Sequence, residues 1–409
     1  MPGFPSLTDP DFVADPFPIY TELRKHDPAH WDETFGAWLI TRYADVWSLL
    51  PDPRLSTDRR LGHDFRPAEG DGWVARFERL SLLHQDVEGH RRWRRRLSIG
   101  FTPRAVRRQE RQVREIVEDF AAPLRGRRGR IDLIREFLDP IPNTVIARIV
   151  GIPPFPGDEA RFRALAQDMI RRFFTFADAA TVARGNAATE ELGEWVFKLA
   201  EDRRQQPAED MISDLIHGAG DGEGQRDGET MTSEEVASLV TMLVSAGSET
   251  TTLGGCQMLR NLMLHPAELA KLRADRSLVP NAVRECLRFN FGSIAPVNPR
   301  YALEDVPLHG RTIRKGDMVL LSTGAANRDP EAFPDPDRLD VTRDTRGVAT
   351  FGHGPRYCLG ANLALQELEC MLEAALDFLP PSARLADEEI EWEQVGVMRR
   401  PMHFPVDFG

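Results

Sequence analysis

The sequence predicts a mainly α-helical protein with a minor amount of β-sheet, built as a single large domain. Apolar residues recur at helical spacing over most of the stretch from residue 88 to residue 380. Short runs of β-forming residues occur near the N-terminus and after residue 295. No Gly/Ser-rich linker, repeat or long charge block divides the 409 residues, so we expect one domain over 1–409. Its smaller, β-containing part should cover about 1–60 and its helical part about 84–380.

The composition is that of a folded, acidic protein. The chain has 52 Lys and Arg against 64 Asp and Glu, a net charge of −12, which excludes a generally basic nucleic-acid-binding protein. Pro and Asp interrupt the apolar residues at the N-terminus, so we expect no signal peptide, no membrane helix and a cytoplasmic location. The four cysteines form no CxxC pair, which argues against disulfides and against a cysteine-rich zinc site.

The elements are expected in the following order. Residues 18–25 should form a helix, and two short β-runs at 30–31 and 37–41 should form a hairpin. The clearest helices are expected at 104–120, 158–170, 186–204, 233–264, 278–290 and 361–379. Further short strands are expected at 306–310 and 318–321. Residues 325–350 are too rich in Pro, Asp and Arg for a helix or a strand and should form an ordered, irregular segment.

The most informative segment is a glycine-rich loop, FGHGPRYCLG, at residues 351–360. Cys358 lies in this loop directly before an amphipathic helix. Gly352, Gly354 and Gly360 permit tight turns that point backbone N–H groups at the sulfur, and the helix dipole favours negative charge there. Both effects stabilise a thiolate. Most lone cysteines are instead small buried hydrophobic residues, which is the interpretation we give to Cys256, Cys286 and Cys370.

This loop resembles the Phe-x-x-Gly-x-x-x-Cys-x-Gly haem-binding signature of the cytochrome P450 superfamily, of the soluble bacterial type. The resemblance implies the cytochrome P450 fold, with haem b held between a long central helix and the cysteine loop with its following helix. It also implies that Cys358 is the axial ligand of the haem iron, that Phe351 packs near it, and that Gly360 lets the next helix approach the porphyrin. The helical part at about 84–380 would then be the haem-binding part.

The helix expected at 233–264 would be about 48 Å long, enough to cross the domain. Thr232 followed by Glu235 is a capping-box pattern at its start. The helix could instead end at Gly254-Gly255, which is a plausible C-cap. Apolar periodicity resumes at residues 258–263, which favours a continuous helix.

The middle of this helix, residues 246–252, is rich in Gly, Ser and Thr, which weaken a helix and offer hydroxyls that compete for backbone carbonyls. Small residues at Ala246 and Gly247 would let a flat ligand approach the backbone. The segment is similar to the family's oxygen-activation motif, with Glu as its acid. The resemblance implies that Glu249 and Thr250 are a catalytic acid–alcohol pair.

Four basic residues resemble the haem-propionate contacts of the family. His90 and Arg94 stand at i, i+4 on one helix face, where both can reach a single anionic group. Arg300 and Arg356 are similar to two further contacts of this kind. Taken alone, each of these residues would more often be a solvated cation.

An ion-pair cluster is also implied by the resemblance. Glu285 and Arg288 match the family's Glu-x-x-Arg motif, which by itself is an ordinary surface pair at i, i+3. The irregular segment supplies Pro336-Asp-Arg338-Leu339, similar to Pro-x-Arg-Phe with Leu in the last place. A cluster of Glu285, Arg288 and Arg338 would fix a segment that has no backbone ladder.

The implied function is that of a monooxygenase, which places one oxygen atom from O2 in a small to medium apolar organic substrate. Electrons would come from a separate ferredoxin or flavodoxin with its reductase, since no phosphate-cradling glycine loop indicates a fused reductase. A peroxide-driven peroxygenase and a non-catalytic haem or ligand sensor are the alternatives, but neither needs Glu249 and Thr250. Neither nucleic acid nor a membrane is expected as a partner.

Two further features concern partners. Residues 91–108 hold eight arginines and no acid, and the resemblance places this helix on the thiolate side of the haem. We therefore expect a positive docking surface for an acidic electron carrier. The common alternative is that these arginines form a solvated helix face. The candidate pocket-lining residues, which are more often core, are Phe65, Trp73, Phe77, Leu82, Leu83, Phe173, Phe174 and Phe176.

Overall fold

The structure is a computed structural model that describes residues 4, 6–7, 9–63, 65–82, 85–153, 159–172, 178–218, 230–292, 299–386, 391–395 and 398–409. Its contacts divide the chain into two units that interleave along the sequence. The first unit comprises Met1–Arg66, Leu253–Cys358 and Asp387–Met402. The second comprises Pro67–Thr252, Leu359–Ala386 and His403–Gly409. The expectation of one domain stays a prediction.

The first unit is organised around a five-stranded mixed sheet of order β1-β2-β8-β5-β3. Its strands are β1 (Ala29–Asp32), β2 (Ala37–Ile40), β3 (Leu55–Ser56), β5 (Arg300–Ala302) and β8 (Met318–Leu321). The pair β1–β2 is the predicted hairpin, and Gly36 takes a φ of 58° in its turn, where a side chain would be strained. Strand β2 then pairs in parallel with β8, which brings the N-terminal residues beside residues 318–321.

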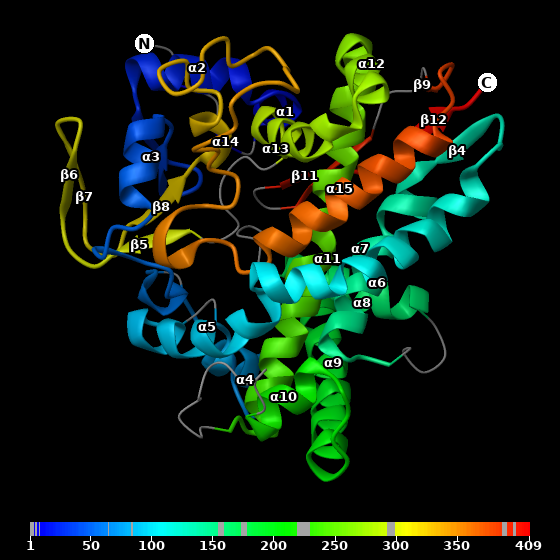
Figure 1. The fold of residues 1–409 in the computed structure, drawn as a ribbon. Helices are drawn as coiled ribbons and strands as arrows, with labels where there is room; N and C mark the ends of the chain where they lie inside the picture. Colours follow the sequence, from blue (N-terminus) through cyan, green and yellow to red (C-terminus); the bar gives the residue numbers. More distant parts are fainter. Residues whose placement is uncertain are drawn as a thin grey trace. The chain divides into compact units, whose positions relative to one another are not determined.

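Helices and two hairpins complete this unit. The helices are α1 (Pro10–Ala14), α2 (Phe17–His26), α3 (Tyr43–Leu49), α12 (Pro266–Ala274), α13 (Val279–Phe289) and α14 (Thr323–Ala326). The hairpins are β6 (Val306–Leu308) with β7 (Arg311–Ile313), and β10 (Trp392–Val395) with β11 (Met398–Pro401). The tip of β6–β7 lies beside α3 (Figure 1), where the His309 imidazole is 2.6 Å from the Asp45 carboxylate. The apolar faces of β2, β8 and α3 meet in one buried cluster.

The second unit is mainly helical. Its helices are α4 (Trp73–Leu80), α5 (Val87–Phe101), α6 (Pro103–Ala121), α7 (Pro140–Val150), α8 (Glu159–Arg171), α9 (Ala179–Gln205), α10 (Met211–His217) and α15 (Ala361–Phe378). Helix α6 packs against α15, and α8 packs against α9. A three-stranded sheet of order β4-β12-β9 joins β4 (Arg130–Asp132), β12 (Pro405–Asp407) and β9 (Arg384–Leu385). Strand β4 lies inside the stretch that the sequence predicts as helical, because three residues are too few to show a period of two.

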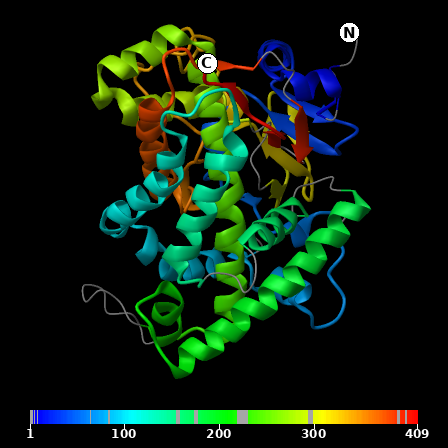
Figure 2. The ribbon, with the colours of Figure 1, turned by 90° about the vertical axis from the view of Figure 1, so that its right-hand side faces the viewer.

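Helix α11 (Ser233–Leu264) is one continuous helix whose residues up to Thr252 belong to the second unit and whose later residues belong to the first. Figure 2 shows it as an unbroken helix. The capping box is confirmed, because the Thr232 N–H donates to the Glu235 carboxylate at 2.9 Å and the Glu235 N–H donates to Thr232 Oγ1 at 3.2 Å. Gly254-Gly255 does not end the helix. No helix in the described part of the chain is long and apolar enough to span a membrane.

Candidate functional site

The cysteine loop of the first unit is a tight, irregular turn. The Cys358 N–H donates to the Phe351 carbonyl at 2.9 Å, and the Tyr357 N–H donates to the Gly354 carbonyl at 3.0 Å. Gly354 has a φ of 75°, and a Cβ there would lie 2.7 Å from the Pro51 Cβ, so both the backbone and the packing require glycine. Cys358 is exposed, whereas Cys256, Cys286 and Cys370 are buried.

Helix α15 begins directly after this loop. Gly360 is its N-cap and forms no side-chain cap hydrogen bond. The first N–H groups of the helix follow Cys358 by only a few residues. A Cβ at Gly360 would meet no described atom within 4 Å, so the described packing of the chain does not itself require glycine at this position. A cysteine placed before a helix N-terminus is favoured as its anion.

Two arginines of the first unit form a positive site. Arg300, in β5, is buried, and Arg356, in the cysteine loop, is half-buried. Burial, followed by the nearby positive charge of Arg356, lowers the pKa of the Arg300 guanidinium to about 10. Two guanidinium groups so placed would be stabilised by an anion, and a haem propionate has the charge and the acceptor atoms to be that anion.

In the second unit, the candidate oxygen-activation residues lie on α11. Thr250 Oγ1 donates to the Ala246 carbonyl at 2.7 Å, and Thr251 Oγ1 donates to the Gly247 carbonyl at 2.9 Å. These bonds are the competition for helix carbonyls that the sequence predicts. Glu249 is buried, with 3% of its surface exposed, while Thr250 is half-buried.

Gly247 has a different neighbour from the one that the sequence suggests. A Cβ at this position would lie 3.3 Å from Ile146 Cγ1 of α7, so the absence of a side chain at Gly247 lets α7 pack closely against α11. The sequence alone gives no signal for this contact, because Ile146 lies 101 positions earlier in the chain. The proposed approach of a flat ligand at Ala246 and Gly247 stays a prediction.

Helix α5 carries the other two basic candidates. The Asp86 carboxylate caps the helix by accepting the Gly89 N–H at 2.7 Å. One turn in, His90 is buried and Arg94 is half-buried, one turn apart on the same helix face. Between them, Trp93 is buried and lies under the guanidinium of Arg96 at 5.6 Å. A packed aromatic ring therefore fixes the face of α5 next to these two residues.

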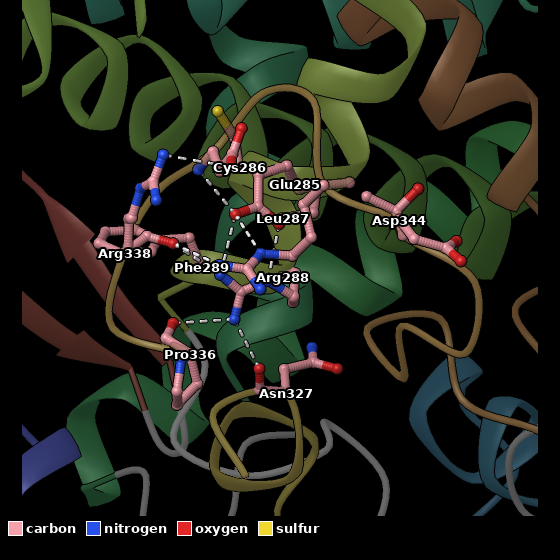
Figure 3. A network of polar contacts seen from close by, with 12 residues as sticks. Glu285, Cys286, Leu287, Arg288, Phe289, Asn327, Pro336, Arg338 and Asp344 are labelled. Carbon is pink, nitrogen blue, oxygen red and sulfur yellow. Dashed lines mark hydrogen bonds and ion pairs between the residues drawn. The ribbon is translucent and has the colours of Figure 1, made fainter. Parts of the chain in front are cut away.

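The ion-pair cluster is present in the first unit, but one of its members differs from the prediction (Figure 3). Glu285 and Arg288 are fully buried and joined by two bonds, from Arg288 Nε at 2.7 Å and from Arg288 Nη2 at 2.9 Å. The second guanidinium on Glu285 is that of Arg343, whose Nε donates to Oε1 at 3.1 Å. The prediction for the Arg338 side chain is wrong, because its guanidinium is 3.5 Å from Asp340 and is largely exposed.

Arg338 instead contributes its backbone carbonyl to the cluster. This oxygen accepts from Arg288 Nη2 at 3.3 Å and from Arg343 Nη2 at 3.0 Å. Arg288 also donates to the carbonyls of Asn327 and Pro336, at 2.8 and 3.0 Å (Figure 3). The two guanidinium groups thus satisfy backbone oxygens of the irregular segment at 327–343, which has no ladder of its own.

The candidate pocket residues divide into two sets. Trp73 and Phe77 are buried in α4, where the Trp73 ring packs on Gly193 of α9 and its Nε1 donates to Glu194 at 3.1 Å. Phe65 lies under the Arg59 guanidinium at 5.9 Å, and Leu82 is buried. The remaining candidates, Leu83, Phe173, Phe174 and Phe176, lie outside the described residues.

The exposed cysteine at a helix start, the buried Arg300 and the half-buried Arg356 are residues of the kinds that the predicted haem-thiolate site requires. In the described part of the chain, no group of three or more His, Cys, Asp or Glu could hold a metal ion. A single cysteine thiolate from the protein would be enough to hold haem iron.

Comparison with known proteins identifies the family. The family model for cytochrome P450 matches residues 59–401. The chain is 34% identical over 402 residues to the cytochrome P450 monooxygenase PikC of Streptomyces venezuelae, covering 97% of this chain and 92% of that one. It is 32% identical over 422 residues to the 6-deoxyerythronolide B hydroxylase of Saccharopolyspora erythraea, covering 99% of each. The solved structure of P450BioI, in complex with an acyl carrier protein ligated to hexadec-9Z-enoic acid, matches with a TM-score of 0.87 at 30% identity, covering 98% of this chain and all of that one.

The chain therefore belongs to the cytochrome P450 family, of the bacterial type. It is a haem-thiolate monooxygenase, an oxidoreductase that acts on an organic substrate. The expected fold class is confirmed.

Proposed function

We propose that the chain is a haem b monooxygenase in which Cys358 is the axial thiolate ligand of the iron. The observation that carries the proposal is the cysteine loop, where the one exposed cysteine of the four follows a turn closed by the Phe351 carbonyl and precedes the N-terminus of α15. When bound, the haem supplies the oxidative chemistry. Phe351 and Gly360 would contact the porphyrin from the two ends of this loop.

The basic candidates would hold the haem propionates. After burial, the positive charge of Arg356 also lowers the pKa of Arg300, and a propionate between the two groups would relieve that repulsion. His90 and Arg94, on α5, would donate to the second propionate, since they share a helix face. Each propionate would thus receive hydrogen bonds from two basic side chains.

Glu249 and Thr250 would move protons into the site. The Thr250 hydroxyl holds its proton toward the Ala246 carbonyl, and a hydroxyl can exchange that acceptor for a water or a substrate by rotation about one bond. Glu249 is the buried carboxyl group next to Thr250 in the sequence, and it would supply protons to the site. Ala246 and Gly247 would leave room for the porphyrin beside this turn.

The electron donor would dock on the arginine surface, which we define as the exposed side chains of Arg91, Arg92, Arg95, Arg104, Arg107 and Arg108 on α5 and α6. These two helices pack together, and no acidic residue occurs between Glu88 and Glu110. In a chain with a net charge of −12, this surface would attract an acidic ferredoxin or flavodoxin and raise its association rate.

The substrate we propose is an apolar organic molecule in the size range of the ligands named for the relatives, hexadec-9Z-enoic acid and 6-deoxyerythronolide B. The support is the similarity in sequence, which extends over 98% or more of this chain in both cases.

The experiment that tests the proposal compares the activity of one protein under three reaction conditions. NADPH consumption and product are measured with purified redox partners, with peroxide alone, and with neither, using a substrate chosen by its shift of the haem absorption. A monooxygenase forms product with the partners and far less with peroxide. Product formed only with peroxide would indicate a peroxygenase, and no product under any condition, despite ligand binding, would indicate a sensor.

A further inference from the structure

The cysteine loop rests on a stack of aromatic rings that the haem-binding motif does not explain. The imidazole of His353, the third residue of the loop, lies flat on the indole of Trp47, with ring centroids 4.0 Å apart and planes 18° apart. Trp47 belongs to α3 and stacks in turn on Tyr43, at 5.4 Å and 17°. All three rings are half-buried. Because Tyr43 and Trp47 are one turn apart in α3, the stack runs from the loop along one face of this helix.

The far end of the stack is anchored to the irregular segment that precedes the loop. The Tyr43 hydroxyl donates to the Gly347 carbonyl at 2.9 Å, and the Tyr43 N–H donates to the Asp329 carboxylate at 2.8 Å. The rings of Tyr43 and Phe333 also pack in a T-shaped arrangement, with centroids 5.7 Å apart. Tyr43 and Trp47 together therefore bind both the segment that leads into the cysteine loop and the loop itself.

The chain directly after α3 supports the loop at the next residue. Pro51 lies against Gly354, so closely that any Cβ at Gly354 would have to displace it. His353 and Gly354 are thus held by Trp47 and Pro51, four positions apart in the sequence. We call Tyr43, Trp47 and Pro51 the loop seat.

The loop is irregular, and side-chain contacts support it together with backbone hydrogen bonds. Those described within it are the bonds from Cys358 to Phe351 and from Tyr357 to Gly354, and Gly352 donates to Ala349 at 2.8 Å just before them. Gly352 and Gly354 add conformational freedom rather than rigidity. Side-chain contacts add to the order of the loop, and the stacked pair of His353 and Trp47 is one such contact.

From this geometry we propose that Trp47 is a positioning residue for Cys358, acting through His353. By fixing the backbone at residue 353, the indole keeps the turn closed between Phe351 and Cys358, and so keeps the sulfur aimed where a thiolate ligand is needed. The proposal rests on the proposed function for the role of Cys358, but the ordering of the loop by Trp47 does not depend on it.

The test compares Trp47→Leu, which removes the stack, with Trp47→Phe, which retains an aromatic ring. Trp31→Leu is the matched control, because Trp31 is also half-buried in the first unit and contacts another ring, Trp38, at 5.4 Å. The first readout is amide hydrogen exchange of a peptide covering residues 351–358 in the full-length protein. The second is the rate at which the reduced protein with CO loses its absorption near 450 nm, the wavelength in the family's name.

We expect Trp47→Leu to accelerate both rates about three- to tenfold, the change that loss of one aromatic pair supports. Trp47→Phe should restore both to within about twofold of the wild type. Trp31→Leu should leave the exchange of residues 351–358 unchanged even where it lowers overall stability. Equal effects of Trp47→Leu and Trp31→Leu, or no rescue by Trp47→Phe, would overturn the proposal. A wild-type protein without the absorption near 450 nm would refute the proposed function but not the role of Trp47, because hydrogen exchange of the loop still tests the loop seat.

Discussion

Replacing Arg343 by alanine should destabilise the protein, whereas replacing Arg338 should have little effect, although the sequence motif points to Arg338. Arg343 Nε donates to the fully buried Glu285 carboxylate at 3.1 Å, and the Arg343 side chain is only 12% exposed. The Arg338 side chain is 63% exposed and lies 3.5 Å from Asp340. Arg338→Ala also keeps the backbone carbonyl to which Arg288 and Arg343 donate.

The magnitude follows from these contacts. A hydrogen bond to a charged group contributes about 1.5–3 kcal/mol, which is the loss expected for Arg343→Ala. An exposed ion pair contributes about 0–1 kcal/mol, so Arg338→Ala should cost at most about 1 kcal/mol. At about 2.1 cal/mol/K of unfolding entropy per residue, 1 kcal/mol shifts the midpoint of a 409-residue chain by about 1 °C. Arg343→Ala should therefore unfold about 2–3 °C below the wild type.

Thermal and urea unfolding, followed by circular dichroism, would measure these differences. A double-mutant cycle with Glu285→Gln sharpens the test, because contacting residues couple by about 0.5–3 kcal/mol and distant ones do not. Arg343→Ala should couple to Glu285→Gln, and Arg338→Ala should not. Equal losses for the two arginine variants, or coupling of Arg338 alone, would refute the assignment of Arg343 to the cluster.

Three other outcomes are expected. Thr250→Ala should keep substrate binding but divert the electrons of NADPH to peroxide. Thr251→Ala, which removes an equivalent hydrogen bond to a helix carbonyl, should not divert them. The amount of product formed per NADPH measures both effects. Gly247→Val should lower the unfolding midpoint, because its side chain would collide with Ile146, and Ile146→Ala should partly restore it. First-electron transfer should slow as ionic strength rises, since charge steering is screened over about 10 Å at 0.1 M salt. Reversing the charge of Arg92, Arg95 and Arg108 should slow this transfer without changing the CO spectrum. A transfer rate that changes neither with salt nor with these substitutions would place the docking site of the donor elsewhere.

The long elements could be predicted from the sequence because their signals are local. The helix expected at 233–264 is α11 with the same bounds, and 361–379 differs from α15 by one residue. The start of α9 was missed, since 186–204 was expected and Ala179–Gln205 is observed. Its first turns contain Thr181, Val182 and Gly185, which are weak helix formers, and their helical state depends on the Asp178 cap and on packing.

In the candidate site, too, local features could be predicted from the sequence and long-range contacts could not. Cys358 could be proposed from the sequence because the features that would stabilise a thiolate, the glycines and the helix start, lie within ten residues of it. Arg343 could not be separated from Arg338 by spacing alone, because the segment that carries both has no period. The contact of Trp47 with His353 joins positions 306 residues apart, so no local sequence pattern predicts it.

The most direct test of the central claim, that Cys358 is the thiolate ligand of haem iron, is the absorption of the reduced protein with CO. The wild type and the control Cys370→Ala, which removes a buried cysteine of α15, should both absorb near 450 nm. Cys358→Ala should lack this band. Persistence of the band in Cys358→Ala, or its absence from the wild type loaded with haem, would contradict the account.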